Sequence, residues 1–220
     1  KQIYIQDHEL LVGGVGFKPR CGILNPDSAA GVIEKEVDTI STRPFDPFYL
    51  SDEGKKVYLE DVKEYWKNKC VLDRWNLMLP EDVRRLRANG AIFIDRKAVR
   101  GYGETTVDWR MIVNKGIGAI KKEAEEALAK LDDAVPGDLE KSFFYRSEIM
   151  VADAIIHLSH RHADLAEQMA AECGDEKRKA ELLKIAEVCR WVPEHPARTF
   201  YEACQSMLTY EYACFMEQNA

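Results

Sequence analysis

Arg190-Trp-Val-Pro-Glu-His-Pro-Ala-Arg-Thr-Phe-Tyr-Glu-Ala-Cys-Gln205 is the stretch from which the organisation of this chain follows. It lies between two predicted helices, Glu176 to Cys189 and Ala197 to about Phe215, and Gly174-Asp175 breaks the chain before the first of them. Glu202 and Gln205 fall on the second helix. In structural terms, both side chains are expected to cap that helix or to bond to neighbouring groups.

The longest predicted helix lies before this stretch and runs from Leu139 to Glu172. Apolar and small residues fall on one broad face of it, and the small ones would let a neighbouring helix approach closely. That face holds Phe144, Ala152, Ile155, Ile156, Ser159, Ala163, Ala166 and Ala170. Another helix is predicted from Asp108 to Leu131, although Gly116 and Gly118 are poor helix formers inside it.

The first half of the chain predicts shorter elements. Ser51 is a candidate N-cap, and Pro80 opens a short helix at its tolerated first position. A short helix also fits Ser28 to Thr39. The rest of residues 1–50 is expected to be irregular, with a strand-like piece at Leu10 to Phe17 that glycines interrupt. The fold class predicted is mainly α with an irregular N-terminal region, without a clear domain boundary.

The composition restricts the partners. The 220 residues are 46% hydrophobic and 31% charged, as in ordinary globular proteins, and the formal net charge is -7. An acidic surface does not attract nucleic acid or an anionic membrane, so neither is expected as a partner. No apolar run approaches the roughly 18 to 20 residues that span a bilayer.

The cysteines point to a reducing compartment. The six lie at positions 21, 70, 173, 189, 204 and 214, without a Cys-x-x-Cys pair. This spacing favours reduced thiols over disulfides or a zinc site, and hence a cytoplasmic protein.

The quoted stretch resembles the Arg…Pro-x-x-Pro-Ala-x-Thr-Phe-x-Glu-Ala-x-Gln segment of glycyl radical enzymes, the pyruvate formate-lyase superfamily. Other segments resemble that family in the same order along nearly the whole chain. They are Ile5-Gln-Asp-His-Glu-Leu-Leu-Val-Gly13, Thr42-Arg-Pro-Phe-Asp-Pro-Phe-Tyr49, Tyr65-Trp-Lys-Asn-Lys69, Asp108-Trp-x5-Lys-Gly-Ile117, Phe144-Tyr-Arg-Ser147 and His160-Arg-His-Ala163. Each is short, and their order is the more specific signal.

The resemblance implies that residues 1–220 are the N-terminal region of a radical lyase of the dehydratase or decarboxylase branch. It implies the front part of a ten-stranded α/β barrel, a homodimer, and activation of a glycyl radical by a radical S-adenosylmethionine enzyme. The family's Gly-Cys-x-Glu and Arg-Val-x-Gly-Tyr motifs do not occur here. No catalytic residue and no bound cofactor are therefore expected in this portion, which we expect to be inactive alone.

Two residues are candidates for substrate contact. Glu104 stands where dehydratase branches of the family carry a histidine that reaches the substrate, and a buried carboxylate would serve as hydrogen-bond acceptor or proton shuttle. It would suit a hydroxyl-bearing or cationic substrate, although it is equally compatible with an acid at a helix N-terminus. Phe93 falls loosely where the family places a pocket aromatic, and core burial is the simpler expectation for it.

Two other interpretations stay open: a non-catalytic helical scaffold, and a metal-binding helical protein. The second would use Asp153, His157, His160 and Asp164, which share one helical stripe from which His162 points away. A solvated polar stripe is the simpler account, and no metal site is predicted. If the chain is a fragment, an exposed apolar patch is expected on the last helix around Leu208, Tyr212 and Phe215.

Overall fold

The computed structural model describes residues 3–16, 24, 26–45, 47–93, 107–132 and 134–217. The chain divides into two compact units. Unit 1 comprises Lys1–Cys21 and Thr106–Glu217, and unit 2 comprises Gly22–Thr105 with Gln218–Ala220. The described residues are helical or irregular and contain no strand, which confirms the mainly α prediction for this portion. The barrel implied by the resemblance stays a prediction.

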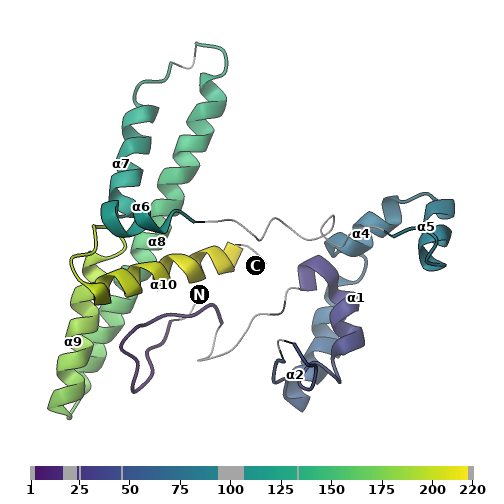
Figure 1. Ribbon diagram of the computed structural model, residues 1–220, viewed down its shortest axis with the longest axis horizontal. Coiled ribbons are helices and arrows are strands. Elements are labelled where there is room, and N and C mark those ends of the chain that lie inside the picture. Colours follow the sequence, from purple (N-terminus) through teal and green to yellow (C-terminus); the bar gives the residue numbers. More distant parts are fainter. Residues whose placement is uncertain are drawn as a thin grey trace. The chain divides into compact units, whose positions relative to one another are not determined.

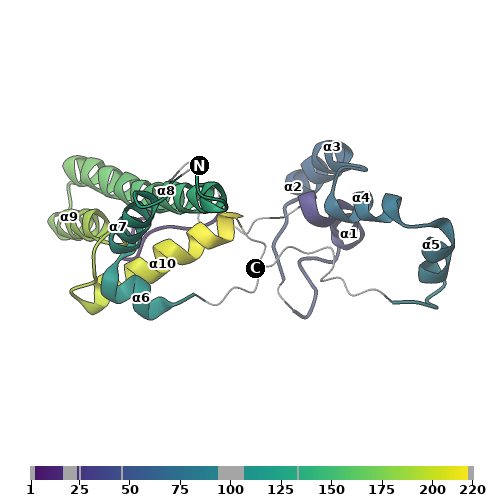
Figure 2. The same cartoon turned by 90° about the horizontal axis from the view of Figure 1, so that it is seen from above.

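Unit 2 is built on α1 (Pro26–Glu36), which contacts α3 (Lys63–Trp66) and α4 (Val71–Met78) (Figure 2). The predicted helix at Ser28 to Thr39 corresponds to α1. Tyr58 is buried, and its hydroxyl donates a hydrogen bond to the Ala30 carbonyl at 3.0 Å. This contact joins α1 to the helical stretch that follows it in sequence.

The helical stretch of unit 2 begins where the sequence predicts. The Ser51 hydroxyl accepts a hydrogen bond from the Gly54 amide at 3.1 Å, so Ser51 is the N-cap of α2 (Asp52–Val57). A π-helical turn, η1 (Tyr58–Val62), joins α2 to α3. Among the described residues of the unit, the last helix is α5 (Glu81–Ala88), which starts one residue later than predicted because Pro80 is its N-cap.

Unit 1 is organised around the 35-residue helix α8 (Asp138–Glu172). α7 (Ile117–Leu128) lies beside its first half and α9 (Glu176–Trp191) beside its second half (Figure 1). α10 (Phe200–Glu217) contacts α6 (Trp109–Lys115), α8 and α9. The predicted helices at 139–172 and 176–189 are thus confirmed, and Asp175 caps α9 by accepting from the Lys177 amide at 2.8 Å.

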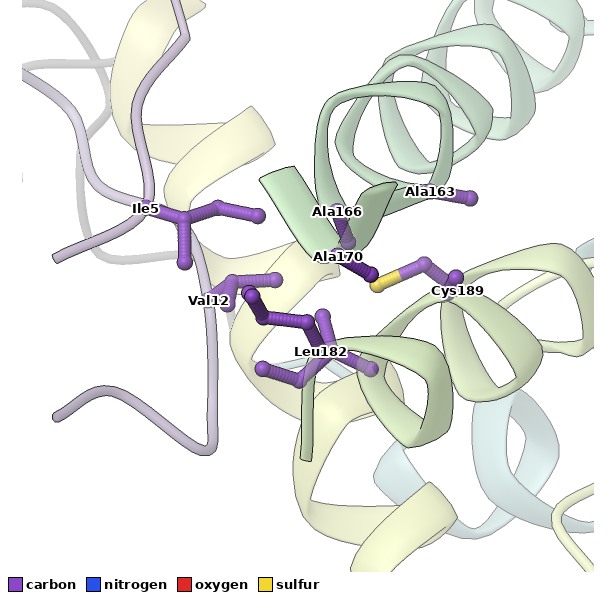
Figure 3. Packing of buried hydrophobic residues seen from close by; sticks show 9 residues of the cluster. Ile5, Val12, Ala163, Ala166, Ala170, Leu182 and Cys189 are labelled. Atoms are coloured by element: carbon purple, nitrogen blue, oxygen red, sulfur yellow. The ribbon is translucent and has the colours of Figure 1, made fainter. Parts of the chain in front are cut away.

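Small residues at the α8–α9 contact let the two helices approach closely, as the sequence indicates. Ala163, Ala166 and Ala170 are buried in one cluster with Cys189 and Leu182 of α9, and Figure 3 shows Ala166 and Ala170 beside these two side chains. A second core cluster joins α6, α7, α8 and α10. Its buried members are Ile112, Ile117, Ala152, Ile155 and Ala213.

Phe144 departs from the predicted core face of α8, since 65% of its surface is exposed. Among the described elements, α7 is the principal neighbour of this half of α8, and it covers the side that holds Ala152 and Ile155. The helical period places Phe144 near the same face as the core residues of α8. It does not show whether a neighbouring helix extends far enough to cover that side chain.

The predicted single helix from Asp108 to Leu131 is wrong, because the chain breaks at Gly116 between α6 and α7. Gly116 has a φ of 78°, a left-handed conformation that L side chains rarely adopt. A Cβ there would lie 2.4 Å from the Glu194 carbonyl oxygen. The break follows from a close approach by a distant segment, which local helix propensity does not reveal.

We expect Gly116→Ala to lower the free energy of unfolding of unit 1 by about 3 kcal/mol, through backbone strain and a clash with backbone atoms. Chemical denaturation followed by circular dichroism measures this. Gly174→Ala is the matched control, because nothing lies within 4 Å of a Cβ built there. That control should change stability by less than about 1 kcal/mol. Equal effects of the two substitutions would contradict the account of the break.

Candidate functional site

The first residues of the chain are anchored on α10 by Gln205. Its side-chain oxygen accepts a hydrogen bond from the Val12 amide at 2.9 Å, and its nitrogen donates to the Val12 carbonyl at 2.9 Å. The same nitrogen lies 3.0 Å from the Thr209 hydroxyl oxygen. Gln205, Thr209 and Val12 are all buried. The amide thus supplies Val12 with the pair of bonds that a neighbouring strand would otherwise give.

Gly13 continues this anchor and has no space for a side chain. Its φ is 123°, and a Cβ would lie 2.2 Å from a ring carbon of Tyr212. Tyr212 is itself buried, and burial raises the pKa of its phenol. The aromatic ring therefore packs directly against the backbone at Gly13. The strand predicted at Leu10 to Phe17 is not formed among residues 10–16, which are irregular.

Arg178 of α9 holds the preceding turn. Its guanidinium donates to the Gln6 carbonyl at 2.8 Å and to the Glu9 carbonyl at 2.9 Å, and it pairs with Glu181 at 3.0 Å. The Tyr201 hydroxyl donates to the Leu10 carbonyl. Backbone groups of residues 6–12 are thus bound by side chains of both α9 and α10.

Residues 192–199 form a tight turn between α9 and α10. The Glu202 carboxylate is buried and accepts from the Arg198 amide at 2.6 Å and from the Arg198 guanidinium at 2.6 Å. The Glu202 amide donates to the Thr199 hydroxyl at 3.2 Å, in the manner of a capping box. Arg198 also lies 4.2 Å from the Trp191 ring centre. Glu202 thus bonds to the start of α10 and Gln205 to the neighbouring Val12 backbone, in line with the structural interpretation of these two residues.

The same turn forms backbone hydrogen bonds with the residues at the break between α6 and α7. The Ile117 amide donates to the Pro193 carbonyl at 2.8 Å, and the Gly118 amide donates to the Glu194 carbonyl at 2.9 Å. In return, the Ala197 amide donates to the Val113 carbonyl at 2.9 Å. We call the Trp191–Arg198 turn and residues 113–118 together the backbone clasp. Both partners of the clasp were singled out in the sequence, although their contact was not.

These contacts stabilise the fold and present no activated nucleophile. Burial raises the pKa of the Cys189 thiol to about 12, which suppresses the thiolate that a reactive cysteine needs. Burial likewise raises the pKa of Cys214. The charged groups of the turn have partners, as Glu202 has in Arg198 and Glu194 has in His160. This region is built to hold backbone segments in place.

The two predicted substrate-contact residues lie apart from this construction. Glu104 lies outside the described residues. Phe93 belongs to unit 2, and 88% of its surface is exposed, so the expected core burial is wrong within that unit. Its side chain is open to contact by other groups, which leaves the substrate role a prediction.

Three of the four residues of the polar stripe on α8 have separate partners. Asp153 pairs with Lys121 at 2.6 Å, His160 lies 3.6 Å from Glu194, and Asp164 pairs with Arg190. Within the part of the chain that the structure describes, no three His, Cys, Asp or Glu residues are grouped as metal ligands. His162 is buried away from the stripe, with Nδ1 2.9 Å from the Leu158 carbonyl oxygen.

The expected patch on α10 is only partly formed. Phe215 is 41% exposed and Leu208 is half-buried, whereas Tyr212 is buried against Gly13. The inclusion of Tyr212 was wrong. The sequence signal that could have corrected it is Gly13-Gly14, because paired glycines often mark a close approach of another group. None of the helices in the described residues is long and apolar enough to cross a membrane.

Comparisons with known proteins agree over the whole chain. Residues 1–220 match the family model described as pyruvate formate lyase-like. The chain is 36% identical over 212 residues to an isethionate sulfite-lyase from Nitratidesulfovibrio vulgaris, covering 93% of this chain and 26% of that protein. It is 32% identical over 209 residues to a trans-4-hydroxy-L-proline dehydratase from Clostridioides difficile, covering 93% of this chain and 26% of the relative.

A solved structure shows the same likeness in three dimensions. The glycerol-bound form of the B12-independent glycerol dehydratase from Clostridium butyricum matches with a TM-score of 0.80 and 32% identity. That match covers 99% of this chain and 28% of the dehydratase. The chain therefore spans about a quarter of the length of the relatives it matches.

The Glu202–Arg198 contact predicts a pH dependence. The Arg198 guanidinium lowers the pKa of the Glu202 carboxyl below its ordinary 4.5. A carboxyl whose pKa is lower in the folded state stabilises the fold above the unfolded pKa, and this contribution is lost as pH falls through the folded pKa. We expect Glu202→Gln to unfold more easily at pH 7, with the difference from wild type shrinking below pH 4.5.

Urea denaturation between pH 3 and pH 8 measures this dependence. Glu172→Gln, at an exposed position on α8, is the matched control and should run parallel to wild type across the whole range. A difference for Glu202→Gln that stays constant with pH would show that the carboxylate's charge contributes nothing.

Proposed function

The chain belongs to the pyruvate formate-lyase-like family, and from this we propose that it is the N-terminal part of a glycyl radical lyase. The complete enzyme would break a carbon–carbon or carbon–heteroatom bond of a small molecule. The observation that carries the proposal is the family match over residues 1–220, with relatives that include a sulfite-lyase and a hydroxyproline dehydratase. A solved relative from Archaeoglobus fulgidus is itself described as a glycyl radical enzyme.

Radical chemistry would be supplied by parts of the enzyme outside residues 1–220. Residues 1–220 contain neither the Gly-Cys-x-Glu nor the Arg-Val-x-Gly-Tyr motif of such enzymes. The cysteine and glycine motifs of the complete enzyme would supply a thiyl radical, which would take a hydrogen atom from a substrate carbon and return it to the product radical after the leaving group departs. We propose that residues 1–220 are inactive alone and bind no cofactor themselves.

The described residues would serve this reaction by fixing the scaffold. The backbone clasp holds the α6–α7 break through three backbone hydrogen bonds, and Gln205 holds Val12 through two more. Backbone pairs of this kind fix position without adding reactive groups. We further propose a cytoplasmic homodimer, activated without oxygen by a radical S-adenosylmethionine enzyme.

Glu104 and Phe93 are the proposed substrate contacts. A carboxylate at position 104 favours a hydroxyl-bearing or cationic substrate, because it repels an anion in a buried site. Isethionate is an anionic sulfonate, so this residue favours a neutral or cationic hydroxy compound over the substrate named for the sulfite-lyase relatives. The glycerol and hydroxyproline dehydratases are named for substrates of the favoured kind.

The proposal predicts a continuation of the reading frame and a protein radical. The gene should continue beyond codon 220 through a Gly-Cys-x-Glu and an Arg-Val-x-Gly-Tyr motif. After anaerobic activation, electron paramagnetic resonance of the full-length protein should show an organic radical that disappears when the glycine of the second motif is replaced by alanine. A stop codon near position 220 and a stable 25.2 kDa product would instead favour a helical scaffold. Stoichiometric metal in the purified protein would favour the metal-binding alternative.

The role of Glu104 has a separate test. We expect Glu104→Gln in the activated full-length enzyme to lower kcat at least about 100-fold, the usual scale for removing a proton-transfer group. The radical signal should keep its wild-type intensity, since activation does not involve this residue. Glu126→Gln, at an exposed position on α7, is the control and should leave kcat unchanged. Unchanged turnover in Glu104→Gln would leave only a helix-terminal role for this residue.

A further inference from the structure

We draw no further inference here: the strongest candidate, the apolar surface patch that Phe143, Phe144, Met150 and Val151 form on the first half of α8, is exposed in a chain that spans about a quarter of the length of its relatives, and nothing in the described part of the structure shows what covers it.

Discussion

The pairing of Gln205 with Val12 is the constraint on which the rest of unit 1 depends. One buried amide satisfies both backbone groups of Val12 and so fixes an irregular segment that has no strand to join. Ile5 and Val12 then reach the core formed by α8 and α9, as Figure 3 shows. Leaving a backbone group of Val12 buried without a hydrogen bond would cost about 1 to 3 kcal/mol of folding free energy. Hydrogen bonds therefore hold this segment in place as much as apolar burial does.

The residues that carry the family resemblance are mostly scaffold residues. The Pro193–Ala197 portion clasps the α6–α7 break, Glu202 closes the turn before α10, and Gln205 binds the entry segment. The segments that resemble the family are far apart in the sequence, yet several of them contact one another in the structure. These segments hold one another in place by backbone contacts in this chain, although they contain no reactive group of the family.

The sequence predicted the long elements well and their partners poorly. Periodicity and caps located α8 and α9 because both signals are local to the helix. The break at Gly116 was missed because its cause, the carbonyls of Pro193 and Glu194, lies some 77 residues away. Phe93 and Phe144 are exposed and Tyr212 is buried, each against expectation, because the side chains that would cover them cannot be read from local pattern. The site residue Glu104 remains a prediction from resemblance alone.

The discontinuity of unit 1 has a consequence for how the chain folds during synthesis. Residues 3–16 leave the ribosome before unit 2, yet their anchors on α9 and α10 are made more than 160 residues later. Unit 2 lies between them in the sequence and can complete its own contacts in that interval. Contacts of such long sequence separation form slowly, and Ile5 and Val12 stay uncovered until α10 exists. Ile5 and Val12 of the nascent chain therefore stay exposed to water throughout the synthesis of unit 2 and of the helices that later cover them.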